Sequence, residues 1–176
     1  MTDLFTLKKY ATNCFLLTIP ILVWNLVFVN KLPPILQPEE FWSNIPGFLR
    51  YGENFSRVFI FALTLVMPLS IITPKQQNGL ALYIGGTLLY FLTWLVLIYF
   101  PNSRWSNSLI GYVALSFTPL IWLIGIGKIG DSFFFNFRFG RLILNFFVFV
   151  FLLLHNFHTM IIFNRNFLDE LSISPL

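Results

Sequence analysis

Residues 141–163, RLILNFFVFVFLLLHNFHTMIIF, constrain the fold more than any other stretch of the chain. The run is long and apolar enough for a helix to cross the hydrocarbon core of a bilayer, which takes about 20 residues. Comparable apolar runs cover residues 10–29, 55–73, 80–100 and 109–126. The sequence therefore predicts an all-α protein, an integral membrane bundle of five transmembrane helices.

Composition supports this class. The 176 residues are 57% hydrophobic and 10% charged, and the charges lie almost wholly between the apolar runs, whereas a soluble domain needs a far more polar surface. No segment is large enough for a second domain, so we expect a single transmembrane helical-bundle domain over 1–176. The net charge of +4 is spread over loops, which argues against a nucleic-acid partner, and Cys14 is the one cysteine, which excludes an internal disulfide.

The first loop, between the runs 10–29 and 55–73, predicts a short interfacial helix near 38–45. Pro38 suits its first position, and Glu39 and Glu40 suit the positive end of its dipole. Pro46 and Gly47 should stop it. Its aromatic and aliphatic side chains would then lie against the membrane surface.

The fourth run predicts close helix packing. Small residues recur there at spacings of three, four and seven, which places them along one stripe: Gly111, Ala114, Thr118 and Gly125. We expect this face to approach another backbone, in a homo-oligomer or against a partner membrane subunit. The bilayer itself is the other expected partner.

Polar side chains recur at helical spacing within residues 141–163. On a helical wheel they share one sector, opposite Ile143, Phe146, Val150, Phe157 and Ile161. Because ionisable groups are costly in a bilayer, they normally face protein or a wet cavity. The predicted functional seam comprises His155, His158, Asn156, Asn145, Arg141 and Thr159.

His155 and His158 lie three residues apart, so their side chains can converge on one metal ion or one proton path. A catalytic zinc site needs a third ligand, which a loop carboxylate would supply: Glu39, Glu40, Glu53 or Asp131. The two histidines cannot ligate opposite faces of one haem within a monomer, and the sequence specifies no cofactor. As a hydrogen-bond partner for His155 from another span we expect one of Asn13, Asn25, Thr64, Thr93, Ser116 or Thr118.

Motifs of known membrane enzymes are absent, including G-x-S-x-G, H-E-x-x-H and a Gly-rich phosphate loop, which disfavours an enzyme. Two functional hypotheses remain. The first is a bundle that binds a small ligand or serves as an accessory membrane subunit. The second is a small transporter or permease that uses the polar face of the fifth span, with Pro119 supplying a bend.

The length, five predicted spans and five tryptophans are similar to the tryptophan-rich sensory protein family, whose members bind porphyrins and sterols. The first loop, KLPPILQPEEFW, departs from that family's tryptophan and proline signature, so the similarity is architectural. Basic residues are six on the N-terminal side of the five spans against five on the other. This asymmetry predicts a cytoplasmic N-terminus, and the composition fits a bacterial inner membrane.

Overall fold

The computed structural model describes residues 10–130, 132–135 and 137–173, with side chains described as far as Arg165. This part of the chain is helical and contains one isolated bridge, between Asn13 and Pro68, in place of strands. The elements are η1 (Cys14–Leu17), α2 (Ile19–Phe28), η2 (Val29–Lys31), η3 (Pro34–Leu36), α3 (Pro38–Phe41), α4 (Gly47–Leu65), α5 (Pro74–Tyr99), α6 (Leu109–Phe117), α7 (Pro119–Ile129) and α8 (Gly140–Ile173).

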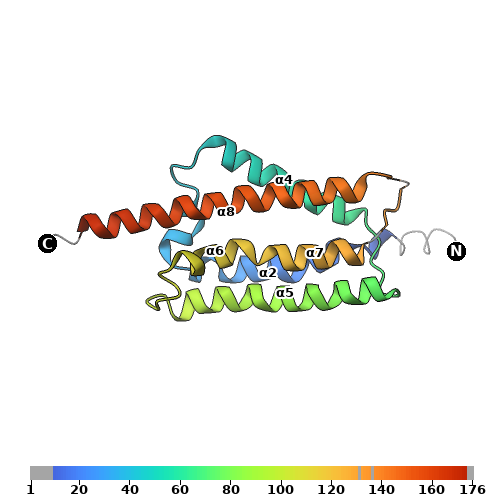
Figure 1. Ribbon diagram of the computed structural model, residues 1–176, viewed down its shortest axis with the longest axis horizontal. Coiled ribbons are helices and arrows are strands. Elements are labelled where there is room, and N and C mark those ends of the chain that lie inside the picture. The colour runs from blue at the N-terminus through green and yellow to red at the C-terminus, as the bar shows by residue number, and fades with distance from the viewer. Residues whose placement is uncertain (1–9, 131, 136, 174–176) are drawn as a thin grey trace.

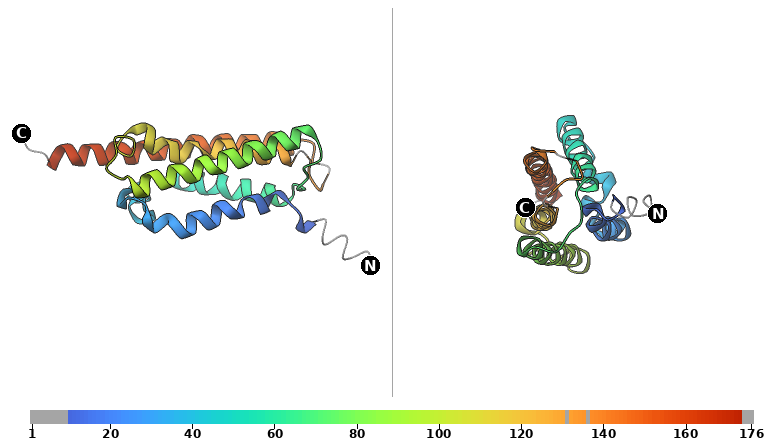
Figure 2. Two further views of the ribbon diagram at one scale, coloured as in Figure 1. Left: turned by 90° about the horizontal axis from the view of Figure 1, so that it is seen from below. Right: turned by 90° about the vertical axis from the view of Figure 1, so that its right-hand side faces the viewer.

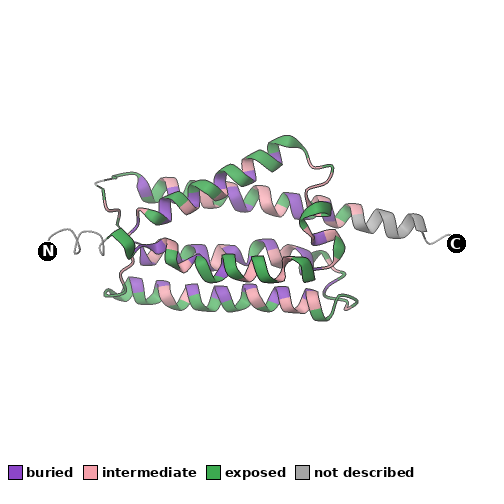
Figure 3. Ribbon diagram, turned by 180° about the vertical axis from the view of Figure 1, so that it is seen from behind, coloured by how far each residue is buried: buried purple, intermediate pink, exposed green. Residues whose placement is uncertain are grey.

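The long helices run side by side along one axis, and successive passes of the chain are antiparallel (Figure 1). α6 and α7 together form one pass. α4 and α6/α7 both contact α8, while α5 packs most extensively against α7 (Figure 2). Buried residues lie on the inner faces of the helices and exposed residues on the outer faces (Figure 3).

Local sequence sets the helix ends. α5 begins at a capping box between Thr73 and Gln76, with Pro74 at its first position, where a missing N–H leaves no hydrogen bond unmade. Pro119 divides the predicted span 109–126 into α6 and α7, because proline lacks the N–H that a continuous helix needs. The neighbouring Thr118 hydroxyl is buried and has no hydrogen-bond partner among the described residues.

Four helical segments are long and apolar enough to cross a membrane, and they indicate an integral membrane protein. They are Cys14–Lys31, Pro74–Tyr99, Leu109–Ile129 and Gly140–Arg165. The span predicted at 55–73 is not confirmed. Its helix, α4, is shifted toward the N-terminus and contains Arg50, Glu53 and Arg57, while residues 66–73 are not helical.

The first loop differs from the prediction at one end. α3 starts at Pro38 and has Glu39 and Glu40 in its first turn, as expected, but it ends at Phe41 instead of Ile45. Gly47 does not stop a helix; it begins α4.

The small residues of the fourth run allow close helix packing inside the bundle. A Cβ added to Gly125 would lie 2.5 Å from the backbone nitrogen of Tyr83, and one added to Gly86 would lie 2.6 Å from that of Trp122, so α5 and α7 meet backbone to backbone. A Cβ added to Gly111 would lie closer still to the carbonyl oxygen of Trp105. The close approach predicted for this stripe is therefore made inside the chain, and association with a second protein through it stays a prediction.

Candidate functional site

The residues of the predicted seam lie on two different faces of α8. His155 and His158 lie toward α4 and α3, where they meet Glu53 and Phe41. Arg141, Asn145 and Asn156 lie toward α6 and α7 and line a groove. The sequence therefore identified the polar residues of α8 but not their division between two sites.

Glu53 is the centre of the first site. Its side chain is fully buried although it carries a carboxylate, and it lies on the inner face of α4, one turn before Arg57. The Arg57 guanidinium donates a short hydrogen bond to Glu53 Oε1. A buried carboxylate is tolerated when cations and hydrogen-bond donors surround it, and Arg57 supplies the first of these.

His158 supplies the second partner. Its ring is fully buried, and both ring nitrogens have partners: Nδ1 lies 2.9 Å from Glu53 Oε2 and Nε2 lies 2.8 Å from the backbone carbonyl oxygen of Phe41. The imidazole also packs against the ring of Phe41, with centroids 3.9 Å apart, and against Trp42. His158 thus ties α8 to both α4 and α3.

His155 approaches Glu53 from the preceding turn of α8. Its Nδ1 lies 3.0 Å from Glu53 Oε1, an ion-pair distance, but without the direction of a hydrogen bond. The ring stacks on Phe151, with centroids 5.2 Å apart, and 18% of its side chain is exposed. The four side chains Glu53, Arg57, His155 and His158 are called the Glu53 cluster below.

Arg165 also connects α8 to α3 and the residues that follow it. Its guanidinium donates hydrogen bonds of 2.8 Å to the backbone carbonyls of Ser43 and Glu40. Together with the bond from His158 to Phe41, three contacts from α8 hold the segment 40–43.

An internal cavity of about 210 Å³ lies beside the Glu53 cluster, among α2, α4, α7 and α8. Arg57 and His155 line it from one side, and Thr18 and Asn25 contribute polar atoms from another. Trp122 also lines it, and its buried indole N–H has no acceptor in the described part of the chain. The cavity is therefore lined mostly by apolar side chains, with a few polar groups among them.

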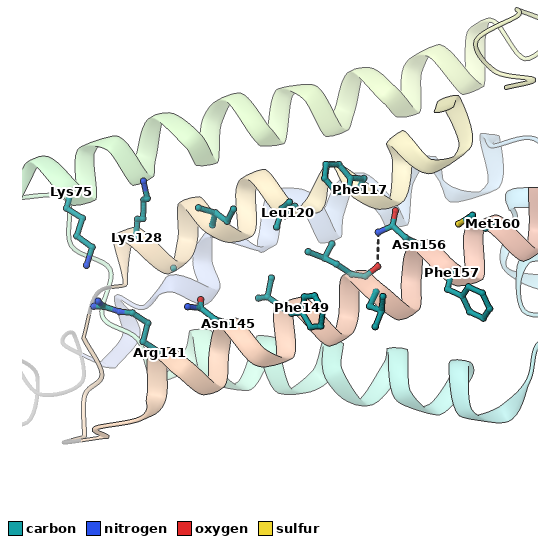
Figure 4. Close-up of a pocket in the computed structure, with 15 residues that line it drawn as sticks. Lys75, Phe117, Leu120, Lys128, Arg141, Asn145, Phe149, Asn156, Phe157 and Met160 are labelled. Atoms are coloured by element: carbon teal, nitrogen blue, oxygen red, sulfur yellow. Dashed lines mark hydrogen bonds between the residues drawn. The ribbon is translucent and has the colours of Figure 1, made fainter. Parts of the chain in front are cut away.

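The second site is the groove between α8 and α6/α7, with a volume of about 880 Å³. Lys75 at the start of α5, Lys128 at the end of α7 and Arg141 at the start of α8 lie near one end of it, with Lys75 directed toward Arg141 and Lys128 directed toward α5 (Figure 4). The rest of the lining is largely apolar: Phe117, Leu120, Ile124, Val148, Phe149, Leu152, Leu153, Phe157 and Met160, with Asn145 and Asn156 along α8.

Asn156 is held in place by its own hydrogen bonds. Its amide donates to the Leu152 carbonyl over 2.7 Å, and its oxygen accepts from the Ser116 hydroxyl over 3.0 Å. Thr159 is buried and donates to the His155 carbonyl. These bonds give Asn156 and Thr159 structural roles in the packing of α8.

The partners expected for His155 are mostly engaged elsewhere. Asn25 accepts a hydrogen bond from Tyr90, and Ser116 reaches Asn156. The side chains of Asn13, Thr64 and Thr93 bond to nearby backbone carbonyls. The group within reach of His155 is Glu53, which sequence reasoning had named as a loop carboxylate; its spacing of four from Arg57 is the signal that places it on a helix.

The metal hypothesis gains no support from the geometry. Among the residues that the structure describes, no group of three or more His, Cys, Asp or Glu side chains is arranged to hold a metal ion. Asp131, one of the predicted third ligands, lies outside the described residues. Comparisons with protein-family models, with curated proteins and with solved structures find no match.

Proposed function

We propose that this protein is a membrane-embedded bundle that binds an anionic amphiphile, with a phosphate or carboxylate headgroup, in the groove between α8 and α6/α7. The observation that carries the proposal is the pairing of three cationic residues at one end of the groove with a long apolar wall. Binding pockets typically measure 300–1,000 Å³ and are mostly apolar with a few well-placed polar groups, and this groove has both properties.

Charge supports a negative headgroup. Lys75 and Lys128 form no ion pair with a carboxylate in the described part of the chain, and no acidic residue lines the groove there. Arg141 points toward Lys75 across the mouth of the groove (Figure 4). An anion at this mouth would meet several positive charges at once, and Asn145 lies one turn farther along α8.

The apolar wall supports a hydrocarbon tail. Phe149, Leu153 and Phe157 line the groove and are at the same time exposed on the outside of the bundle. The groove is therefore open sideways, toward the position that lipid takes around a membrane bundle. From Arg141 to Met160 its α8 wall is about 28 Å long at 1.5 Å per residue, close to the thickness of a hydrocarbon core.

We also propose that α4 is the fifth crossing. Its outward side is largely apolar, with Phe48, Phe55, Val58 and Phe59 exposed, although Arg50 and Asn54 are exposed near its start, and Glu53 is directed inward. Cysteines at Glu39 and Gln77, in a Cys14→Ala background, test this with a membrane-impermeant thiol reagent on sealed vesicles. Five crossings place the two positions on opposite sides of the membrane; four crossings, with α4 outside it, place them on the same side.

On this arrangement the cationic end of the groove lies at the same end of the bundle as the start of α2 (Figure 1). With a cytoplasmic N-terminus, as the basic residues of the loops predict, that end meets the leaflet that is rich in anionic lipid. Orientation and the type of membrane remain part of the proposal.

The test is lipid binding by the purified protein in nanodiscs or detergent. We expect phosphatidylglycerol or a fatty acid to bind in preference to phosphatidylcholine, and comparison of the first two distinguishes a phosphate from a carboxylate headgroup. Replacing Lys75 or Arg141 with Gln should weaken binding about fivefold, since a basic residue contributes about 1 kcal/mol to attraction of anionic lipid. Arg104→Gln, at the other end of the bundle, is the charge control.

A second pair of variants tests the wall of the groove. Gly127 lines it, and a Cβ there meets only Leu144 at 3.7 Å, so Gly127→Leu should fold and fill the groove. Gly85→Leu is the control, because a Cβ at Gly85 meets nothing within 4 Å. Equal binding of all lipids by both variants would refute the proposal, and a co-purifying membrane protein lost in Gly127→Leu would indicate the accessory-subunit function instead.

The internal cavity favours the transporter hypothesis as a second candidate. It lies within the bundle beside Pro119 and is lined by His155, as a substrate path through the bundle requires. Flux into proteoliposomes that His155→Ala abolishes would support this candidate, and unchanged flux would remove its basis.

A further inference from the structure

The hydrogen bonds of His158 determine how many protons the Glu53 cluster holds. A backbone carbonyl oxygen can only accept, so the contact of 2.8 Å from Nε2 to Phe41 requires a proton on Nε2. A neutral imidazole with Nε2 protonated has a bare lone pair on Nδ1. That atom lies 2.9 Å from Glu53 Oε2, which carries lone pairs of its own when ionised.

Two unprotonated acceptors do not form a contact of this length, because both atoms are electron-rich and a separation of 2.9 Å leaves no room for a water molecule between them. One proton must therefore lie between Nδ1 of His158 and Oε2 of Glu53. The pair is either imidazolium with carboxylate or neutral imidazole with carboxylic acid. In both forms it holds one proton more than an ordinary neutral histidine beside an ionised glutamate.

We infer that Glu53 and His158 form a buried proton-binding site inside the bundle, with His155 as the neighbouring base on the cavity side. His155 places Nδ1 at 3.0 Å from the other carboxylate oxygen, and the same ring lines the internal cavity. The site is separate from the groove proposed for lipid, so each proposal can fail without the other.

The charged groups around this proton indicate where it resides. On α4, Arg57 bonds to Glu53 Oε1 and favours the ionised carboxylate, which leaves the proton on His158 as an imidazolium. Among the described side chains of α8, that of Arg165 is the other charged one nearby. Its guanidinium donates hydrogen bonds to the backbone carbonyls of Glu40 and Ser43. From α3 and the residue after it, the site is contacted by the backbone carbonyl of Phe41 and by the rings of Phe41 and Trp42. The side chains of Glu39 and Glu40 are exposed.

Loss of the proton would leave His158 with an electron pair directed at a carboxylate, with both side chains fully buried. The structure opposes that loss, since the remaining counter-charge, Arg57, contacts only one of the two carboxylate oxygens. We therefore expect the shared proton to stay between Nδ1 of His158 and Oε2 of Glu53.

The chain contains two histidines, so selective ¹⁵N-histidine labelling of the full-length protein in nanodiscs gives two imidazole signals, which His155→Gln assigns. We expect His158 to carry protons on both nitrogens at pH 7.5. An infrared band of a protonated carboxyl group that Glu53→Gln removes would place the same proton on Glu53 and would also support the site. A neutral His158 beside an ionised Glu53 at pH 7.5 would overturn it.

Two variants test the cause. Glu53→Gln replaces the carboxylate with an amide that can donate to Nδ1, so His158 should then carry one proton at pH 7.5, whereas Glu39→Gln, an exposed carboxylate of the neighbouring α3, should leave both nitrogens of His158 protonated. If Glu53→Gln fails to fold, Arg57→Gln serves, because removal of the cation that favours the ionised carboxylate should move the shared proton toward Glu53 and give the infrared band of a carboxyl group. Unchanged spectra in the variant that folds would refute the assignment.

Discussion

His158 should contribute more to stability than His155, although both belong to the Glu53 cluster. His158→Ala removes two contacts between separate helices, to Glu53 and to Phe41, and interhelical hydrogen bonds in membranes average about 0.6 kcal/mol each. It also removes a fully buried ring that packs on Phe41, and deletion of a buried aromatic ring costs about 3–5 kcal/mol in soluble cores. The void borders the short helix α3, which can move in and fill part of it. We therefore expect a loss of about 3 kcal/mol, at the lower end of that range.

His155→Ala should cost about 1 kcal/mol. Its contact with Glu53 lacks hydrogen-bond geometry, and its ring borders a cavity that already exists, so removal enlarges a void instead of creating one. Unfolding by sodium dodecyl sulfate in mixed micelles, or by steric trapping in bicelles, measures both variants on one scale. A loss for His155→Ala that equals or exceeds that of His158→Ala would refute this reasoning.

Further predictions concern packing and the fastening of α3. Gly125→Ala should destabilise by about 1–3 kcal/mol, because its Cβ meets backbone that cannot move alone, whereas Gly85→Ala, in open space, should stabilise by up to about 1 kcal/mol in the same unfolding assay. Arg165→Gln should leave the helices intact but increase amide hydrogen exchange in residues 40–43, and unchanged exchange would show that Arg165 does not hold α3. Tyr90→Phe should cost about 0.6 kcal/mol, since it removes the bond from its hydroxyl to Asn25; a stability equal to that of the parent would contradict this.

Much of the fold followed from the lengths of the apolar runs and from proline positions. Four of the five apolar runs coincide with helical segments long and apolar enough to cross a membrane, and Pro119 marks the junction of α6 and α7 as proline chemistry requires. Residues 66–73 are apolar yet not helical. Their backbone bonds to another part of the chain, as Met67 does to Cys14, and hydropathy cannot distinguish such a segment from a helix.

The site was predicted in part, because a helical wheel gives directions but not neighbours. The wheel placed Asn145, Asn156 and His155 in one sector of α8. In the bundle α8 has α4 on one side and α6/α7 on another, so adjacent directions within that sector meet different helices. His155 consequently faces Glu53, while Asn156 faces Ser116. Which helix lies beside α8 depends on the packing of the whole bundle, and no local pattern in the sequence specifies it.

The same reasoning explains why α4 fails a hydropathy criterion and still fits a membrane position. On insertion scales, each Arg or Asp at the centre of a helix costs about 2.5–3.5 kcal/mol, a value that treats the residue as surrounded by lipid. In α4 the carboxylate of Glu53 is fully buried and bonded to Arg57 one turn away and to His158 on another helix, so its charge is compensated within the protein. The side of α4 that faces outward presents Phe55, Val58 and other apolar residues. Hydropathy averages over all faces of a helix, whereas lipid contacts only the outward face, which for α4 is apolar from Phe55 onward and carries Arg50 and Asn54 nearer its start.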